Sequence, residues 1–351
     1  MSKVTFWNIC AGRLPKIFFQ MKTLFIGSTR RGFLTLQAML EAGVQVVGVM
    51  SLTQHAHERE RYEDAMRELA QTRGIALRET KLAREPELIA WVRSLDAEAA
   101  VAVGVRVLLP EGVYSAFPKG CWAVHDSLLP EYRGFAPLNW ALINGERTTG
   151  VTLFQVSPQM DEGDILLQEA LAIGDDDAAP EVYEQVCAAT LRVVVQGCAL
   201  LRAGLPPLRR QEHARATFTC SRAPGNGLID WNQPTHVIFN LIRALTFPYP
   251  GAFTYLEGAQ LYLVAAHRVS EPPCYVGRIP GHVVQILSTG EVDVLTGDGV
   301  LRIAEVSTDG ESKRPPAELI RSVRTKLGID TVELVTRLAK LEAALAAGTL
   351  A

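Results

Sequence analysis

The stretch Cys121–Leu166, CWAVHDSLLPEYRGFAPLNWALINGERTTGVTLFQVSPQMDEGDIL, indicates how this chain folds. It opens within a short apolar strand, Gly120–Val124, and His125 follows where that strand ends. The chain then turns at Ser127–Pro130, well before the next strand-like run, Gly150–Val156. Open sheets built from alternating strands and helices bind their ligands at the carboxyl ends of strands. The stretch therefore predicts an α/β sheet with a binding site beside His125.

Strand-like and helix-like runs alternate on both sides of this stretch. Apolar runs of strand length separate charged, helix-like segments, and such alternation requires crossover connections between parallel strands. The expected strands are Thr23–Gly27, Val44–Met50, Ala99–Gly104, Gly120–Val124, Gly150–Val156 and Asp164–Ala172, and the expected helices are Glu58–Arg73, Glu87–Leu95 and Glu181–Ala203. The predicted fold class is α/β, a Rossmann-like, doubly wound parallel sheet.

A second, smaller domain is expected after the sheet. Residues 1–20 are interpreted as an N-terminal extension, because they contain neither the apolar core nor the cleavage site of a signal peptide. The α/β domain then covers 21–204, and 205–227, rich in Pro, Arg and Gly, reads as a linker. Residues 228–330 contain one helix and five short strands separated by turns, which predict a small β-barrel.

The C-terminal segment, 331–351, is expected to be an amphipathic helix. Its leucines at 334, 338, 341 and 345 recur at helical spacing. The segment is too short to indicate a coiled coil, so the leucines are interpreted as a stripe that packs against the protein.

Composition excludes several classes of protein. The formal net charge is −3, whereas binding to nucleic-acid phosphates needs a basic surplus, so DNA is not expected as a partner. No apolar run reaches the roughly 18 residues that span a bilayer, and no membrane association is expected. The six cysteines form no CxxC pair, so neither a disulfide framework nor a zinc site is indicated. A reduced, cytoplasmic protein is expected.

Two motif-like stretches are interpreted as structural. Gly27–Gly32 follows the first strand, where dinucleotide-binding proteins carry GxGxxG, but it lacks the middle glycine and no acidic residue ends the second strand. A plain tight turn is expected there. His55 and His57, beside Glu58 and Glu60, have ligand-type side chains, yet they are interpreted as an exposed helix start, and no metal site is expected.

His125 and Asp161 are the candidates for acid–base chemistry. His125 ends a buried strand, and Asp161 lies in the loop Met160–Gly163 after the following strand. A histidine and a carboxylate presented by adjacent loops at one sheet edge can exchange protons with a substrate. A histidine at a strand end also occurs as a hydrogen-bonded loop anchor, and periodicity alone leaves both interpretations open.

The pattern HxSLLPxYRGxxPxxWAxxxGExxTGVT, followed by MDxGDIL, resembles the signature of the 10-formyltetrahydrofolate-dependent formyltransferases. This family includes methionyl-tRNA, glycinamide ribonucleotide and sugar-nucleotide amine formyltransferases. The resemblance covers roughly residues 22–328, because GLIDWNQP and RALTFPYPGAFTYL resemble the family's OB-like C-terminal domain. The stretch YRGFAPLNWALINGE is most similar to the domain that formylates UDP-4-amino-4-deoxy-L-arabinose.

The resemblance implies transfer of a formyl group from 10-formyltetrahydrofolate to a primary amine. His125 matches the histidine that manages the amine proton, and Asp161 matches the aspartate that holds the imidazole and supports its protonated form. Tyr132, Arg133 and Asn139 are expected in the acceptor pocket, with loop bracing as the alternative. The positions that match folate contacts are Val107, Leu108, Leu109, Ser127, Leu128, Leu129, Pro130, Ser157, Pro158, Gln159, Met160 and Asp161.

The sequence departs from the family pattern at two positions. Ala123 stands where the family has an asparagine whose amide stabilises the oxyanion, and losing one such donor costs on the order of 10²–10³ in rate. The Ser127 hydroxyl, a backbone N–H or a water could replace it. Phe135 stands where the arabinosamine enzymes tend to carry a basic residue.

A small or nucleotide-linked amine is expected as the acceptor. Methionyl-tRNA formyltransferases carry a basic, Gly/Pro-rich insertion after the second strand, whereas the corresponding stretch here, SLTQHAHERERYEDAM, has mixed charge. Three functions remain: a formyltransferase acting on a sugar nucleotide or small amine, a tRNA formyltransferase, and a non-catalytic folate-binding relative, the last motivated by Ala123.

Overall fold

The computed structural model describes residues 21–52, 61–80, 86–204 and 206–346. The expected N-terminal extension, the pair His55 and His57, and the last residues of the C-terminal segment lie outside these ranges. The chain divides into two compact units. The first contains the described residues up to 137 together with 148–172 and 184–220, and the second contains 138–147, 173–183 and the chain from 221 onward.

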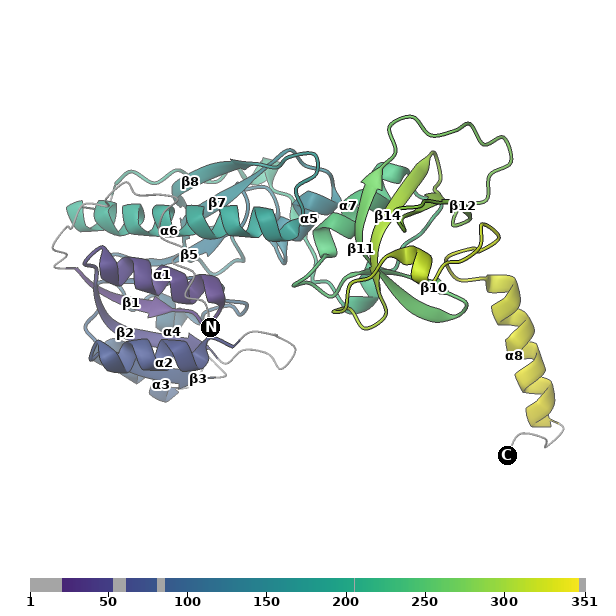
Figure 1. Cartoon of the computed structure of the whole chain (residues 1–351). Coiled ribbons are helices and arrows are strands. Elements are labelled where there is room, and N and C mark those ends of the chain that lie inside the picture. Colours follow the sequence, from purple (N-terminus) through teal and green to yellow (C-terminus); the bar gives the residue numbers. More distant parts are fainter. Residues whose placement is uncertain (1–20, 53–60, 81–85, 205, 347–351) are drawn as a thin grey trace. The chain divides into compact units, whose positions relative to one another are not determined.

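A seven-stranded sheet forms the centre of the first unit (Figure 1). Its strands, in spatial order, are β3 (Ala76–Thr80), β2 (Gln45–Leu52), β1 (Lys22–Ile26), β4 (Ala99–Ala102), β5 (Cys121–His125), β7 (Thr148–Gln155) and β8 (Ile165–Ala172). The first five strands are mutually parallel. From β1 the chain adds β2 and β3 on one side and then β4 and β5 on the other, as the predicted doubly wound α/β class requires. The class is confirmed, but β7 and β8 are antiparallel to their neighbours, so the sheet is mixed.

Helices cover both faces of this sheet. On one face, α3 (Pro86–Ser94) and α4 (Glu111–Tyr114) share an apolar cluster with β1, β2 and β4. Elsewhere α1 (Arg30–Glu41) packs against α6 (Ala179–Ala203) through Ala38, Ala42 and Val195, and Figure 1 shows the two helices side by side. The remaining helix of this unit is α2 (Glu63–Thr72).

Helix α6 is long and apolar enough to cross a membrane by length and composition alone. Its most apolar window has a mean hydropathy of 1.5, but 56% of that window is buried inside the protein. The apolar composition of α6 is therefore accounted for by packing in the core.

Strand β3 was not predicted from the sequence. Its residues, ALRET, include two adjacent charged side chains and one large apolar one, and only Thr80 is buried. An edge strand pairs on one side only and has little apolar surface to bury. The hydrophobic signal on which strand prediction depends is consequently weak in β3.

The segment expected as a linker contributes ordered structure to the first unit. A short strand, β9 (Phe218–Thr219), pairs in parallel with β6 (Arg133–Gly134). Arg209 exchanges backbone hydrogen bonds with Ile165 at the start of β8. A short 3-10 turn covers His213–Arg215 in the first unit, and two more, Pro224–Gly227 and Pro316–Glu318, lie in the second.

The second unit is built on a five-stranded antiparallel sheet. Its spatial order is β10 (Ala252–Leu256), β11 (Ala259–Arg268), β14 (Val300–Ser307), β13 (Val292–Leu295) and β12 (Val283–Ile286). Segment Thr325–Gly328 connects the two edges, because Gly328 N donates to Tyr255 O of β10 while Leu327 N donates to Gly281 O beside β12. This closure gives the sheet the character of the expected small barrel.

Two buried polar side chains attach neighbouring segments to α7 (Thr235–Leu245) of the second unit. Asn139 Nδ2, on α5 (Pro137–Ile143), donates to Ala244 O at 2.7 Å. Arg243 Nη1 donates to Gly174 O and Asp177 O at 3.0 and 2.9 Å. These bonds explain why 138–147 and 173–183 belong to this unit.

The C-terminal helix forms as expected, as α8 (Thr331–Ala346), but its leucines do not pack. Leu334, Leu338, Leu341 and Leu345 expose between 49 and 67% of their surface. The expectation of a packing stripe is therefore wrong for the residues that the structure describes.

Closure of the barrel depends on Gly281, which has φ +88° and whose added Cβ would lie 2.4 Å from Leu327 O. We expect Gly281→Ala to lower the unfolding free energy of the second unit by at least about 1 kcal/mol, because it combines a left-handed backbone with a steric clash. Chemical denaturation measures the loss. Gly277→Ala, which meets nothing within 4 Å, is the matched control and should be neutral. Equal stability of the two variants would contradict the closure.

Candidate active site

His125 lies at the end of β5 between two oxygen acceptors. Its ring is buried, Nε2 is 2.7 Å from Tyr132 O, and Nδ1 is 3.7 Å from Asp161 Oδ2. Both ring nitrogens therefore face oxygen atoms, an arrangement that orients the ring. The two candidates from the sequence are brought together.

Asp161 reaches His125 by a route that the sequence did not predict. Because β5 and β7 are antiparallel, His125 pairs with Thr152, and Gln155 at the end of β7 pairs with Trp122 near the start of β5. The β7–β8 loop thus leaves the sheet at the amino end of β5 and folds back to place Asp161 beside His125. The expectation of adjacent loops at one sheet edge was wrong about the path, although the contact forms.

Asp161 has a constrained backbone and a specific donor. Its φ is +55°, a left-handed conformation uncommon outside glycine, and Gly134 N donates to its Oδ2 at 2.8 Å. Gly163 in the same loop tolerates no side chain, because an added Cβ would lie 1.7 Å from Gln155 O. Strained backbone that persists is held by its surroundings and clusters at functional sites.

Gln211 fixes this loop from the segment expected as a linker. Its Nε2 donates to Asp161 O at 2.8 Å and to Gly163 O at 2.7 Å. Its Oε1 accepts from Arg133 Nε and Nη2, at 3.1 and 2.6 Å. Arg133 is itself buried, and its Nη2 lies 3.0 Å from His213 Nδ1. Gln211 and Arg133 thus connect the loops on either side of the His125–Asp161 pair.

Sequence reasoning did not identify Gln211 as part of the site. It lies 50 positions from Asp161 in a segment without periodicity. The signal that was present is a glutamine in a Pro- and Arg-rich stretch, LPPLRRQEH, and a single polar residue in such a stretch carries no pattern.

An ion pair involves the residue that directly follows His125. Arg31, at the start of α1, pairs with Asp126, and both side chains are largely buried. Thr29 caps the helix by accepting from Gly32 N at 3.2 Å. The expected plain tight turn over Gly27–Gly32 is therefore wrong for its second half, because Arg30–Gly32 form the first turn of α1, which supplies the cation beside Asp126.

The Ser127–Pro130 turn is held by its own hydrogen bonds. Ser127 Oγ donates to Glu131 O at 2.6 Å, and Thr152 Oγ1 donates to Ser127 O at 2.6 Å. Gln168 Nε2 donates to Leu129 O at 2.8 Å. Since the buried Ser127 hydroxyl already donates its proton within the turn, the structure favours other substitutes for the missing oxyanion donor.

Ala123 lies on the same face of β5 as His125, two residues earlier. It packs against Leu129, Phe154 and Ile165, so its immediate surroundings are apolar. Ala123 contributes no polar group beside the imidazole.

The other residues expected to contact folate divide into exposed and buried sets. Val107, Leu108 and Met160 are exposed, as are Pro158 and Gln159, while Ser157 is partly buried and donates to Gln159 O at 3.1 Å. Leu109, Leu129 and Pro130 are buried and Leu128 is partly buried.

The residues expected in the acceptor pocket act as braces where their contacts are defined. Arg133 is buried against Gln211, and Asn139 is buried in the second unit, bound to Ala244 O. Tyr132 supplies its carbonyl to His125. Two aromatic side chains near the pair are exposed instead: Phe135, which follows Gly134, and Phe218, which lies opposite Arg133 in the β6–β9 pair.

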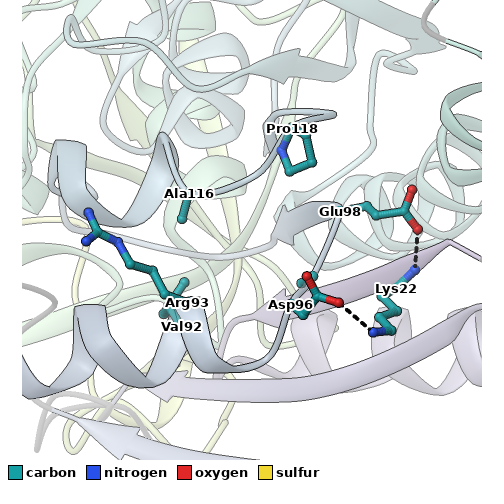
Figure 2. A pocket seen from close by; sticks show the side chains of 8 residues that line it. Lys22, Val92, Arg93, Asp96, Glu98, Ala116 and Pro118 are labelled. Carbon is teal, nitrogen blue, oxygen red and sulfur yellow. Dashed lines mark hydrogen bonds and ion pairs between the residues drawn. The ribbon is translucent and has the colours of Figure 1, made fainter.

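A separate pocket of about 380 Å³ lies away from this site, at the amino ends of β1 and β4 (Figure 2). Lys22 Nζ pairs with Asp96 at 2.8 Å, and Lys22 N donates to Glu98 Oε1 at 3.2 Å. The acidic and basic groups there neutralise one another, and His125 and Asp161 are at the other end of β5. The lining residues are Lys22, Val92, Arg93, Asp96, Ala97, Glu98, Ala116 and Pro118.

The arrangement suits proton transfer rather than nucleophilic catalysis by a thiol. Burial raises the pKa of Cys121 and of Cys198 to about 12, so both thiols stay protonated near neutral pH. Among the described residues, no group of three or more His, Cys, Asp or Glu side chains is arranged to hold a metal. The His125–Asp161 pair is a group able to accept a proton at the sheet end.

Two family models match the chain. The model described as formyl transferase matches residues 21–197, and the model described as formyl transferase, C-terminal domain, matches residues 223–324. A methionyl-tRNA formyltransferase from Geobacter metallireducens is 30% identical over 311 residues, which cover 88% of this chain and 98% of the relative.

Solved structures share the fold at lower identity. An N-formyltransferase from Helicobacter canadensis, solved with folinic acid and dTDP-3-aminofucose, has a TM-score of 0.62 and 15% identity, covering 81% of this chain and 98% of its own. HypX from Aquifex aeolicus, solved with tetrahydrofolic acid, has a TM-score of 0.56 and 19% identity over 85% of this chain. The chain spans only 46% of that HypX chain.

The hydrogen bonds of Gln211 make its removal a test of the site. In Gln211→Leu, the carbonyls of Asp161 and Gly163 lose their donor, and each lost bond is worth about 1 kcal/mol. We expect the amide of Gly134, which donates to Asp161, to exchange with solvent at least about tenfold faster. Gln71→Leu, on the exposed side of α2, is the control. An unchanged exchange rate in Gln211→Leu would show that the β7–β8 loop keeps its conformation without the hydrogen bonds from Gln211.

Proposed function

Because the chain belongs to the formyltransferase family, whose formyl donor is 10-formyltetrahydrofolate, we propose that it formylates a primary amine of a sugar nucleotide or similar small molecule. Formyl transfer from the folate is the family's reaction. The observation that carries the proposal for this chain is the buried His125 held between Tyr132 O and Asp161.

His125 receives the proton that the acceptor amine must lose. Formation of the new C–N bond leaves a proton in excess on the amine nitrogen, and breaking the bond to the donor requires a proton on the leaving nitrogen. An imidazole with one carboxylate neighbour can take the first proton and return it to the leaving group. Asp161 supports the charged ring by Coulombic attraction.

The exposed apolar residues among the expected folate contacts suit the chemistry of the donor. A folate has flat, partly apolar ring systems, and Val107, Leu108 and Met160 present exposed apolar side chains from loops of the first unit. These side chains, with the backbone of Ser157–Asp161, would hold the donor. The donor supplies the formyl carbon and leaves as tetrahydrofolate.

The acceptor is inferred from charge, neighbours and exposed aromatic groups. The net charge of −3 gives no general attraction for tRNA phosphates, and the Helicobacter canadensis enzyme was solved with an amino-sugar nucleotide. Phe135 and Phe218 are exposed, the latter by 70%, and aromatic faces of this kind stack on nucleobases. The methionyl-tRNA formyltransferase relative supports tRNA as the alternative.

The five cysteines described are free, in keeping with a cytoplasmic setting.

The His125–Asp161 pair gives the first test of this function. We expect His125→Ala and Asp161→Ala to lower formyl transfer by about 10²–10⁴-fold with the fold intact, because general acid–base catalysis contributes that much. Tetrahydrofolate release with a competent acceptor measures the rate, and circular dichroism checks folding. Glu162→Gln, which removes a neighbouring carboxylate of the same loop, is the control. Near-normal turnover in either alanine variant would overturn the assignment.

Ala123 gives the second test. Ala123→Asn should restore an amide donor on the face of β5 that carries His125, and oxyanion donors act mainly on the transition state. We expect kcat to rise by roughly tenfold or more while folate affinity changes little. Ala123→Leu is the control, because leucine adds bulk as asparagine does but has no hydrogen-bond donor. It separates the effect of the amide from the effect of side-chain size.

A lower kcat in Ala123→Asn would instead mean that the space beside His125 is needed by the acceptor or a water. If the parent chain and Ala123→Asn both bind folate but formylate no amine, the chain is a folate-binding relative and the proposed activity is wrong.

A further inference from the structure

Helix α8 lies outside the part of the chain that family membership explains. The two family models end at residues 197 and 324, whereas α8 covers Thr331–Ala346. No residue of α8 belongs to the site around His125. Its sequence pattern therefore needs a separate explanation.

The pattern of α8 is that of a coiled-coil seam. Leu334, Leu338, Leu341 and Leu345 are spaced by four, three and four residues, which places them alternately at the d and a positions of a heptad. Each exposes about half of its surface or more. A continuous exposed leucine stripe is costly in water and marks a surface that another apolar surface covers.

We propose that α8 pairs in parallel with the α8 of a second copy of this chain. In the same heptad Arg337 occupies a g position and Glu342 the following e position, and both are exposed. In a parallel pair, each g residue faces the e residue five positions later in the partner helix, so Arg337 of each copy meets Glu342 of the other. An antiparallel pair would place Glu342 opposite Val335 and lose this match.

The length of α8 sets the strength of the pairing. Its 16 residues hold about two heptads, and free-standing coiled coils need roughly three or four. The pairing is thus reversible, and the fraction of paired chains rises with protein concentration. It is independent of the proposed formyl transfer, because α8 contributes no group to that reaction.

The test is the mass of the full chain, measured by sedimentation over about two orders of magnitude in concentration. The parent chain should shift from monomer to dimer. Leu338→Glu places one charge on each of the two paired helices, within their apolar contact, and should weaken dimerisation by at least about tenfold. Ala339→Glu, one residue away at an outward b position, should dimerise as the parent does.

Exchanging the charges at Arg337 and Glu342 tests whether the two helices are parallel. This test does not require the Leu338→Glu variant to fold. Arg337→Glu should weaken dimerisation, and adding Glu342→Arg should restore it. A parent chain that stays monomeric overturns the proposal, as does a Leu338→Glu variant that still dimerises. Monomeric chains with a lower melting temperature in Leu338→Glu would show that α8 packs on its own chain instead. Dimerisation insensitive to Arg337→Glu would overturn the parallel arrangement.

Discussion

The position of the Asp161 carboxylate depends on hydrogen bonds from outside the β7–β8 loop that carries it. The antiparallel pairing of β5 with β7 sends this loop away from His125, so the loop must fold back. Gln211 holds the returning loop through the carbonyls of Asp161 and Gly163, and Gly134 N holds the carboxylate itself. These bonds help to hold the left-handed backbone of Asp161, a conformation that aspartate adopts more readily than most residues other than glycine.

The same contacts explain why an arginine in the signature is buried. Gln211 Oε1 accepts from Arg133 Nε and Nη2, so this side of the guanidinium is already engaged within the protein. Arg133 is buried, whereas Phe135 and Phe218 nearby are exposed. The proposal for the acceptor therefore rests on the exposed aromatic side chains rather than on Arg133.

The sequence predicted the parts of the fold that have strong hydrophobic periodicity. The parallel strands β1, β2, β4 and β5 are continuous apolar runs, and both His125 and Asp161 follow such runs. Strand β3 was missed because an edge strand buries little apolar surface. The antiparallel direction of β7 was missed because hydrophobic periodicity does not encode strand direction. Gln211 was missed because a long-range hydrogen bond leaves no local pattern. Helix α8 was predicted correctly from its leucine spacing, but the spacing does not specify which surface covers the leucines.

The proposed reaction is formyl transfer to a small amine, at a site with alanine where the resemblance to the family implies asparagine. The most direct measurement incubates the full chain with 10-formyltetrahydrofolate and, in separate reactions, with UDP- or dTDP-linked amino sugars or with initiator methionyl-tRNA. We expect an N-formylated sugar nucleotide, formed with an equal amount of tetrahydrofolate, and no formyl-methionyl-tRNA. Formylation of the tRNA without formylation of any amino sugar would contradict it.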